Sequence, residues 1–160
     1  MKTTSILVAL SAIALAASGC HKAADTAATP PVSEADAAKV ADATVAAWIS
    51  MDATKIKALY GPSVVGFDYA IGPLSTDRVT WDRAQDIFAA AKIDGAVQVS
   101  RNIQILDSDV FVVSGVWDMT SSTMPASNGT VRCTDVYQKD ANGHWPIVNE
   151  HCSAMPKAAA

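Results

Sequence analysis

The sequence has no excess of basic residues, no recurring histidine pattern and no internal repeat. Its 12 lysines and arginines are outnumbered by 16 aspartates and glutamates, which gives a net charge of −4. Since proteins bind nucleic acid largely by neutralising phosphates with basic side chains, we do not expect a nucleic-acid partner. The three histidines, His21, His144 and His151, share no short spacing of the kind that holds zinc. We therefore expect no metal and no cofactor.

Long apolar runs are also missing once the first 17 residues are passed. No later run approaches the roughly 20 apolar residues that a membrane-spanning helix needs. Residues 1–19 contain Lys2, an apolar run at 6–17 and small residues at the end, which is the layout of a secretory signal. The run is too short to cross a bilayer as a permanent helix, so we expect it to be removed.

Residues 15–20 read Leu-Ala-Ala-Ser-Gly-Cys and resemble the end of a bacterial lipoprotein signal. The resemblance implies that Cys20 is lipidated and becomes the first mature residue, with a membrane as its partner. More than one acyl chain, at about 0.8 kcal/mol per buried methylene, holds a protein stably on a membrane. His21 stands where an aspartate would imply inner-membrane retention, so the resemblance implies the outer membrane, facing the periplasm. An ordinary cleaved signal beside a free cysteine is the alternative.

Cleavage before Cys20 leaves 141 residues, which is enough for one domain with a core of its own. Residues 20–32 are rich in alanine and threonine and contain Pro30 and Pro31, so they predict a flexible tether. We expect the folded domain at residues 33–155 and a disordered tail at 156–160.

Three helices are predicted in the first half of the domain. Ser33 can cap a helix of about sixteen residues whose apolar side chains recur at helical spacing. Asp52 can cap a second, shorter helix that ends at Gly61 and Pro62, and Thr80 can cap a third.

The rest of the domain predicts mainly strands, separated by turn residues. The expected strands are residues 64–69, 97–106, 110–120, 130–139 and 144–153. Helices followed by a run of antiparallel strands are typical of an α+β domain with its helices on one face of a curved sheet.

Four segments carry a resemblance to a known family: residues 46–52, 58–68, 134–137 and 145–153. They are similar to the SnoaL-like branch of the nuclear transport factor 2-like superfamily, which also contains ketosteroid isomerase, and the resemblance covers about residues 33–155. It implies a cone, in which a curved antiparallel sheet wraps around three helices and leaves an apolar pocket at the wide end. It also implies a homodimer, because such domains often pair through the outer face of the sheet.

The resemblance places two carboxyls where ketosteroid isomerase-like enzymes do proton transfer. Asp68 matches the aspartate that moves the substrate proton, and Asp135 matches a protonated acid that donates to the developing oxyanion. Two acids in one apolar cavity have pKa values pushed apart, which suits a base and a donor. The expected tyrosine on the first helix is replaced by Thr44, a much poorer acid. The alternative is structural, with Asp68 at the pocket mouth and Asp135 hydrogen-bonded within the sheet.

The last two strands predict a hairpin with a two-residue turn at Asn142 and Gly143. In that register the numbers of opposing residues sum to 285, so Cys133 lies opposite Cys152. Asp135 then lies opposite Glu150 on the same, pocket-facing side. Four residues alternate onto the outer face, where a dimer could cover them: Trp145, Ile147, Asn149 and His151.

With Cys20 lipidated, Cys133 and Cys152 are an even pair in an oxidising compartment, which favours a disulfide. Pro146 opposes Lys139 at a hydrogen-bonded site of this register and cannot donate there, which favours a longer or bulged turn. A one-residue bulge would send the two cysteines to opposite faces. Unpaired cysteines would then be small buried apolar groups.

We expect the pocket to be lined by Thr44, Trp48, Tyr69, Trp117 and Glu150, although the tryptophans fit a plain core as well. The sequence leaves three functions open. The first is an envelope-tethered lipoprotein that binds a small apolar molecule. The second is a ketosteroid isomerase-like enzyme with Asp68 as the base and Asp135 or Glu150 as its polar partner. The third is a dimeric assembly domain without catalysis.

Overall fold

The computed structural model describes residues 30–68, 72–123, 125 and 128–155 of the chain. The predicted signal, the lipidation site Cys20, most of the tether, Tyr69 and the tail lie outside the described residues. None of the described helices has the length and apolar character needed to cross a membrane.

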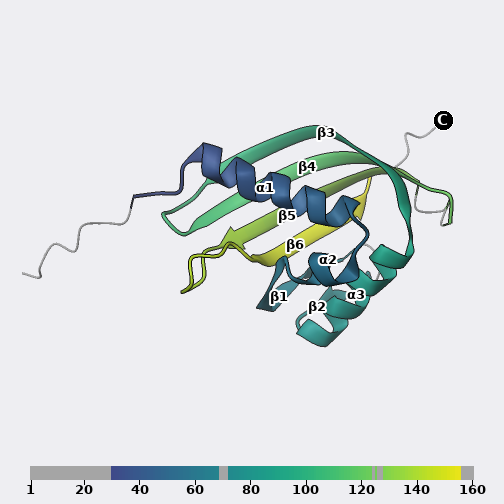
Figure 1. Ribbon diagram of the computed structural model, residues 1–160, viewed down its shortest axis with the longest axis horizontal. Coiled ribbons are helices and arrows are strands. Elements are labelled where there is room, and N and C mark those ends of the chain that lie inside the picture. Colours follow the sequence, from purple (N-terminus) through teal and green to yellow (C-terminus); the bar gives the residue numbers. More distant parts are fainter. Residues whose placement is uncertain (1–29, 69–71, 124, 126–127, 156–160) are drawn as a thin grey trace, which may run out of the picture.

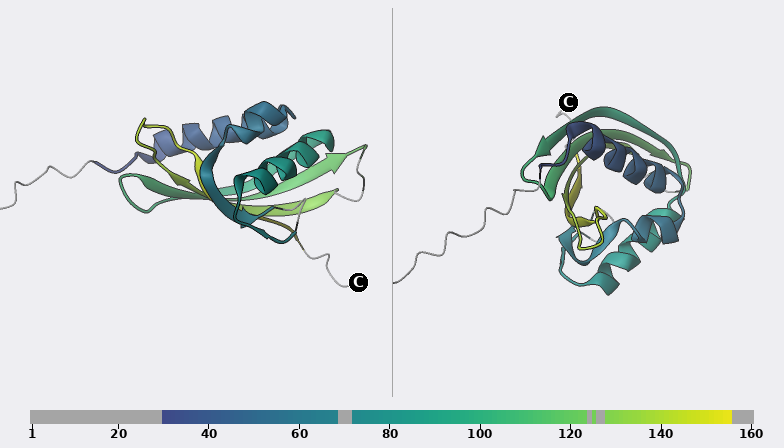
Figure 2. Two further views of the ribbon diagram at one scale, coloured as in Figure 1. Left: turned by 90° about the horizontal axis from the view of Figure 1, so that it is seen from below. Right: turned by 60° about the vertical axis from the view of Figure 1, so that its left-hand side comes forward.

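Three helices pack on one side of a six-stranded sheet, which makes an α+β domain (Figure 1). The helices are α1 (Glu34–Ile49), α2 (Ala53–Lys57) and α3 (Arg78–Ala90). The strands are β1 (Tyr60–Phe67), β2 (Leu74–Ser75), β3 (Ile93–Ile105), β4 (Val110–Ser121), β5 (Gly129–Gln138) and β6 (Ile147–Ala154). Figure 2 shows the sheet curving around the helices, as the resemblance implies.

The strands lie in the order β2-β1-β6-β5-β4-β3. Neighbours are antiparallel except β1 and β6, which run parallel, so the expectation of a purely antiparallel sheet is wrong at this one pair. The chain passes through β2 and α3 between β1 and the hairpin-connected strands, and this crossover lets the first long strand lie beside the last one. As a result, residues about 85 positions apart in the sequence become neighbours.

The helix starts follow from local capping. Ser33 accepts a hydrogen bond from the backbone N–H of Asp36, and Asp52 accepts from the N–H groups of Thr54 and Lys55, as predicted. The prediction for α3 is wrong, because Asp77 is its cap and accepts from the backbone N–H of Thr80 at 2.8 Å. Asp77 has extended backbone geometry and offers a carboxylate one helical turn before Thr80, so the helix begins earlier.

The second helix ends before the sequence predicts. Gly61 and Pro62 lie inside β1, and Tyr60 is the first residue of that strand and not the last of a helix. Pro62 lies in the stretch of β1 between Tyr60 and Val65, where the register with β6 shifts. The proline is accommodated there, since it has no N–H to donate to the ladder.

The hairpin of β5 and β6 has the predicted residue pairs at the cysteines and acids, because two shifts of the register cancel there. Near the turn the backbone N–H of Gln138 donates to the carbonyl of Pro146, so the pairing is shifted by one residue from the predicted register. A bulge between the pairs Val136–Asn149 and Tyr137–Ile147 restores it. Cys133 therefore opposes Cys152, and Asp135 opposes Glu150.

The same two departures move the residues between them to the other face. Ile147 is fully buried in the core and does not lie on the outer face. Trp145 is partly buried and packs on Phe111, with ring centroids 5.0 Å apart. Of the four residues predicted on the outer face, only Asn149 and His151 are exposed. The physical reason is the bulge, because an extra residue in one strand reverses the alternation of side chains on its turn side.

Candidate functional site

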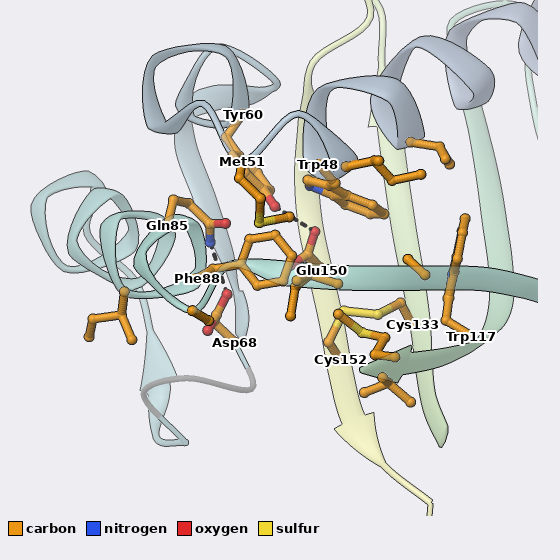
Figure 3. A pocket seen from close by; sticks show the side chains of 18 residues that line it. Trp48, Met51, Tyr60, Asp68, Gln85, Phe88, Trp117, Cys133, Glu150 and Cys152 are labelled. Carbon is orange, nitrogen blue, oxygen red and sulfur yellow. Dashed lines mark hydrogen bonds between the residues drawn. A yellow bond between two sulfur atoms is a disulfide. The ribbon is translucent and has the colours of Figure 1, made fainter. Parts of the chain in front are cut away.

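A cavity of about 440 Å³ opens between the helices and the concave face of the sheet. That volume lies in the range of small-molecule sites. Its wall is mostly apolar and aromatic, and Figure 3 shows the side chains pointing into it. The apolar and sulfur-containing lining residues are Val45, Trp48, Ile49, Met51, Phe88, Ile87, Ala91, Ile93, Ala96, Trp117, Met119, Val131, Cys133 and Cys152.

Four polar side chains complete the wall of this cavity: Tyr60, Asp68, Gln85 and Glu150. They come from β1, the residue after β1, α3 and β6, so the bent sheet and one helix supply them together. Of the predicted pocket residues, Trp48, Trp117 and Glu150 therefore lie where the sequence places them, and Asp68 joins them.

Thr44 and Asp135 lie elsewhere. Both are buried, and they line a separate space of about 10 Å³, together with Tyr137 and Arg101. That space holds about one water molecule and no substrate. Neither Thr44 nor Asp135 therefore lines the main cavity, although Asp135 lies opposite Glu150, which does.

Asp135 and Glu150 form a buried pair of carboxyls. The phenol of Tyr60 donates a hydrogen bond to Oε2 of Glu150 at 2.9 Å. Burial raises the pKa of Glu150 well above its usual value, and the nearby charges of Asp135 and Asp68 raise it further. Burial also raises the pKa of Asp135 to about 7, although a hydrogen bond with Glu150 lowers it in part. The pair therefore retains a proton at neutral pH.

One oxygen of this pair has no partner among the described residues. Oδ1 of Asp135 is buried and accepts no hydrogen bond within the described part of the chain. A buried carboxyl oxygen without a donor is costly as a charged group and cheaper as a neutral one. This agrees with the direction in which its pKa moves.

Asp68 is held in place by α3. Nε2 of Gln85 donates to Oδ2 of Asp68 at 2.9 Å, and both side chains are buried. The arrangement orients the carboxyl toward the cavity (Figure 3). A positioned carboxyl on the wall of an apolar cavity can accept a proton or a hydrogen bond from a ligand.

Cys133 and Cys152 form a disulfide across β5 and β6, with Cα atoms 4.2 Å apart, as the register predicts. The disulfide lies on the cavity wall. The sulfur of Cys152 lies within 4.8 Å of carboxyl oxygens of Asp135 and Glu150. Because that sulfur is bonded to Cys133, it is no thiolate ligand, and this trio does not make a metal site.

Two polar residues of the site, Tyr60 and Gln85, are not among those that the sequence predicts. A second helix that runs to Gly61 would include Tyr60, and only its pairing in β1 shows that its phenol reaches Glu150. Gln85 did leave a signal. It lies four residues after Trp81 and three before Phe88, so it is a polar residue in the middle of a buried helix stripe.

Comparisons with protein-family models and with curated proteins gave no match. Many solved structures match the chain. A candidate calcium/calmodulin-dependent protein kinase II association domain from Xanthomonas campestris is 30% identical, with a TM-score of 0.68 over 82% of this chain and 95% of that one. A candidate dehydratase of the nuclear transport factor 2-like family from Streptomyces avermitilis is 16% identical, with a TM-score of 0.63 over 76% and 94%. The chain therefore has the nuclear transport factor 2-like fold.

A third neighbour is a candidate ketosteroid isomerase from Shewanella frigidimarina, 17% identical, with a TM-score of 0.62 over 73% of this chain and 94% of that one. These three neighbours carry descriptions as an association domain, a dehydratase and an isomerase. Function on this fold follows from the pocket, since one fold serves unrelated activities. In this chain, the pocket has a phenol, an amide and two carboxyls in an otherwise apolar wall.

Proposed function

We propose that this nuclear transport factor 2-like domain binds a small apolar molecule in its cavity and works at the cell envelope, tethered by a lipid on Cys20. The observation that supports binding is the cavity of about 440 Å³ with a mostly apolar lining and four polar side chains at its wall. In a mainly apolar pocket, a small number of polar groups orients the ligand, and the apolar wall supplies most of the affinity. The lipoprotein-like signal at residues 15–20 supports the tether at the outer membrane.

Mass spectrometry of small molecules that co-purify with the lipid-free mature chain tests the binding proposal. The chain without residues 1–20 keeps every described helix and strand, so the pocket is intact. An Ala96→Phe variant fills the cavity, and Val97→Phe places the same ring on an adjacent, exposed position. We expect an apolar compound with the wild type and with Val97→Phe, and little with Ala96→Phe. Equal recovery from all three would contradict binding in this cavity.

Tethering has its own test. Metabolic labelling with a clickable fatty acid, followed by membrane fractionation, should label the wild-type chain and place it in the outer-membrane fraction. A Cys20→Ala variant should be unlabelled. Label on that variant, or a wild-type chain free of lipid, would contradict the proposal.

A second candidate is an enzyme that moves a proton, with Asp68 as the base. It is favoured by the hydrogen bond between Tyr60 and Glu150, which supplies the phenol that Thr44 lacks. In this version Glu150 is the polar partner, because Asp135 does not line the main cavity. A βγ-unsaturated ketosteroid gives a conjugated product that absorbs in the ultraviolet. We expect Asp68→Asn to abolish turnover and to retain ligand binding.

We also propose that the domain forms homodimers through the outer face of the sheet. Neighbours described as association domains support an assembly of some kind. The outer face carries polar side chains around a groove, among them Ser100, Ser114, Thr134 and His151. A second sheet can approach such a surface closely.

A further inference from the structure

The wall of the main cavity contains acidic groups but no basic ones. Among the described residues that line it, Asp68 and Glu150 are the ionisable carboxyls, and no lysine, arginine or histidine is present. Tyr60 and Gln85 are neutral. The wall can therefore carry only negative charge, so it should repel an anionic ligand such as a fatty acid.

Glu150 lies at the centre of this negative region. It is 3% exposed and receives the phenol of Tyr60. The charged groups that act on it, Asp135 from β5 and Asp68 from the end of β1, have the same sign as its own carboxylate. A buried carboxylate needs a cation or a proton to neutralise it. In the empty cavity that cation is a proton.

The described arginines near the site are engaged elsewhere. Nη1 of Arg101 pairs with Oδ1 of Asp42 at 2.5 Å, and Arg101 lines the small space beside Asp135. Nε of Arg78 pairs with Asp82 at 2.7 Å, and its Nη atoms donate to backbone carbonyls at Lys57 and Tyr60. Neither residue lines the cavity. A ligand is therefore free to supply the positive charge.

Aromatic rings line the same cavity. Trp48, Phe88 and Trp117 are part of the wall to which Glu150 belongs (Figure 3). The face of an aromatic ring attracts a cation, most strongly in tryptophan and away from water. The same rings also pack against hydrocarbon. The cavity wall can thus contact both the charged group and the apolar body of an apolar, positively charged molecule.

We propose that the ligand is a hydrophobic amine, with its ammonium group at Glu150 and its hydrocarbon body against Trp117, Met119 and Val131. This inference rests on the proposed function, because it names the chemical class that the apolar pocket takes. On binding, the ammonium group replaces the proton that Glu150 and Asp135 hold in the empty cavity. The proton leaves to solvent, so charge is conserved in the buried site.

Three probes with one hydrocarbon cage test the proposal: adamantanamine, adamantanol and adamantanecarboxylic acid. Their binding to the lipid-free mature chain is followed by the fluorescence of Trp48 and Trp117, which line the cavity. At a pH of about 8 the amine is charged, and we expect its dissociation constant to be at least about tenfold lower than that of the alcohol. The acid should bind weakest. Titration calorimetry in buffers of different ionisation enthalpy should show proton release with the amine alone.

A Glu150→Gln variant keeps the shape of the side chain and removes its charge. We expect it to lose the preference for the amine, so that the amine and adamantanol bind to within about twofold of each other. A cooperative urea unfolding transition shows that the variant is folded. Glu34→Gln removes a charge of the same kind from the exposed first turn of α1, and it should keep the preference.

The outcomes separate this inference from the proposed function. If the alcohol binds as tightly as the amine, or the acid binds best, the cavity is an apolar site and the amine proposal is wrong. If none of the three probes binds, both the apolar-binding function and the amine proposal are overturned. A preference for the amine that survives Glu150→Gln also overturns the proposal.

Discussion

The phenol of Tyr60 and the carboxyl of Glu150 are hydrogen-bonded at 2.9 Å, although 90 residues separate them in the sequence. The parallel pairing of β1 with β6 brings them together. The contact joins one of the site's two pocket carboxyls to the phenol that the first helix does not supply. The site therefore forms only when these two distant strands pair.

Removing this phenol should destabilise the domain. We expect Tyr60→Phe to lower the free energy of unfolding by about 1–3 kcal/mol, because a buried carboxyl loses its donor. Urea denaturation measures the change. In a Glu150→Leu background the same substitution should cost less, since the phenol has no carboxyl there to donate to. An equal cost in both backgrounds would mean that the phenol acts through packing and not through Glu150.

The buried acid pair should make stability fall as the pH rises. The pKa of Asp135 is raised from 3.8 to about 7 in the folded chain, so between these values the folded state binds a proton that the unfolded state releases. Stability is then complete below about pH 4 and declines toward pH 7, with a slope of up to about 1.4 kcal/mol per pH unit for one such group. Urea unfolding across this range measures it.

Asp135→Asn is the matched variant for that slope. The amide resembles the protonated acid in shape and does not titrate, so the decline between pH 4 and 7 should become shallower. Asp36, Asp77, Asp94 and Asp140 have pKa values lowered by hydrogen bonds and opposite charges. They are ionised in both states above about pH 5 and so do not contribute to the slope between pH 5 and 7. An unchanged slope in Asp135→Asn would show that Asp135 is not the titrating group.

Gly66 lies in β1 opposite Glu150 of β6. A Cβ added there would collide with the backbone carbonyl of Glu150. We expect Gly66→Ala to cost more than about 3 kcal/mol, because the two strands would have to separate. Gly61→Ala is the control on the same strand, since its Cβ would meet the carbonyl of Ile147 at an ordinary 3.5 Å. Thermal unfolding of both variants should show a large loss for the first and a small one for the second.

The Cys133–Cys152 disulfide closes a loop with a sequence separation of 19. We expect the double variant Cys133→Ala, Cys152→Ala to lose about 2–4 kcal/mol, chiefly because the unfolded chain gains freedom. A reducing agent should shift the urea midpoint of the wild type and leave that of the double variant unchanged. A wild type insensitive to reduction would contradict a stabilising role for the bond.

The proposed homodimer depends on the outer face of the sheet. Light scattering of the lipid-free chain should give twice the mass of one chain, and Thr134→Arg should give the mass of one, because a long charged side chain in the middle of the face keeps the sheets apart. Thr54→Arg, on the exposed side of α2, is the control and should stay dimeric. Dimers that persist in Thr134→Arg would place the interface elsewhere.

Much of the local structure could be predicted from particular residues. Ser33 and Asp52 are each followed by a segment with helical spacing, so they identified α1 and α2. The alternating strands and the turn at Gly143 gave the last hairpin. Asp77 was missed as the cap of α3, because Thr80 offers an equally good side chain three residues later and nothing local separates the two.

The register of that hairpin shows where such prediction stops. The loop and the bulge each shift the pairing by one residue, and they cancel at Cys133 and Cys152. They do not cancel at Ile147, which packs into the core instead of facing outward. A bulge depends on how the whole strand meets its neighbours, so counting residues from the turn does not predict it.

The sequence by itself determined the α+β class and the helix starts that depend on a neighbouring cap. These depend on residues close together in the chain or on the alternation of a strand. Only the tertiary structure decided that Tyr60 and Asp68 meet Glu150 around one cavity and that Thr44 and Asp135 line a smaller one behind it. The reason is that the parallel contact of β1 with β6, and the curvature of the sheet around the helices, arise from packing between distant segments, which leaves no local signal.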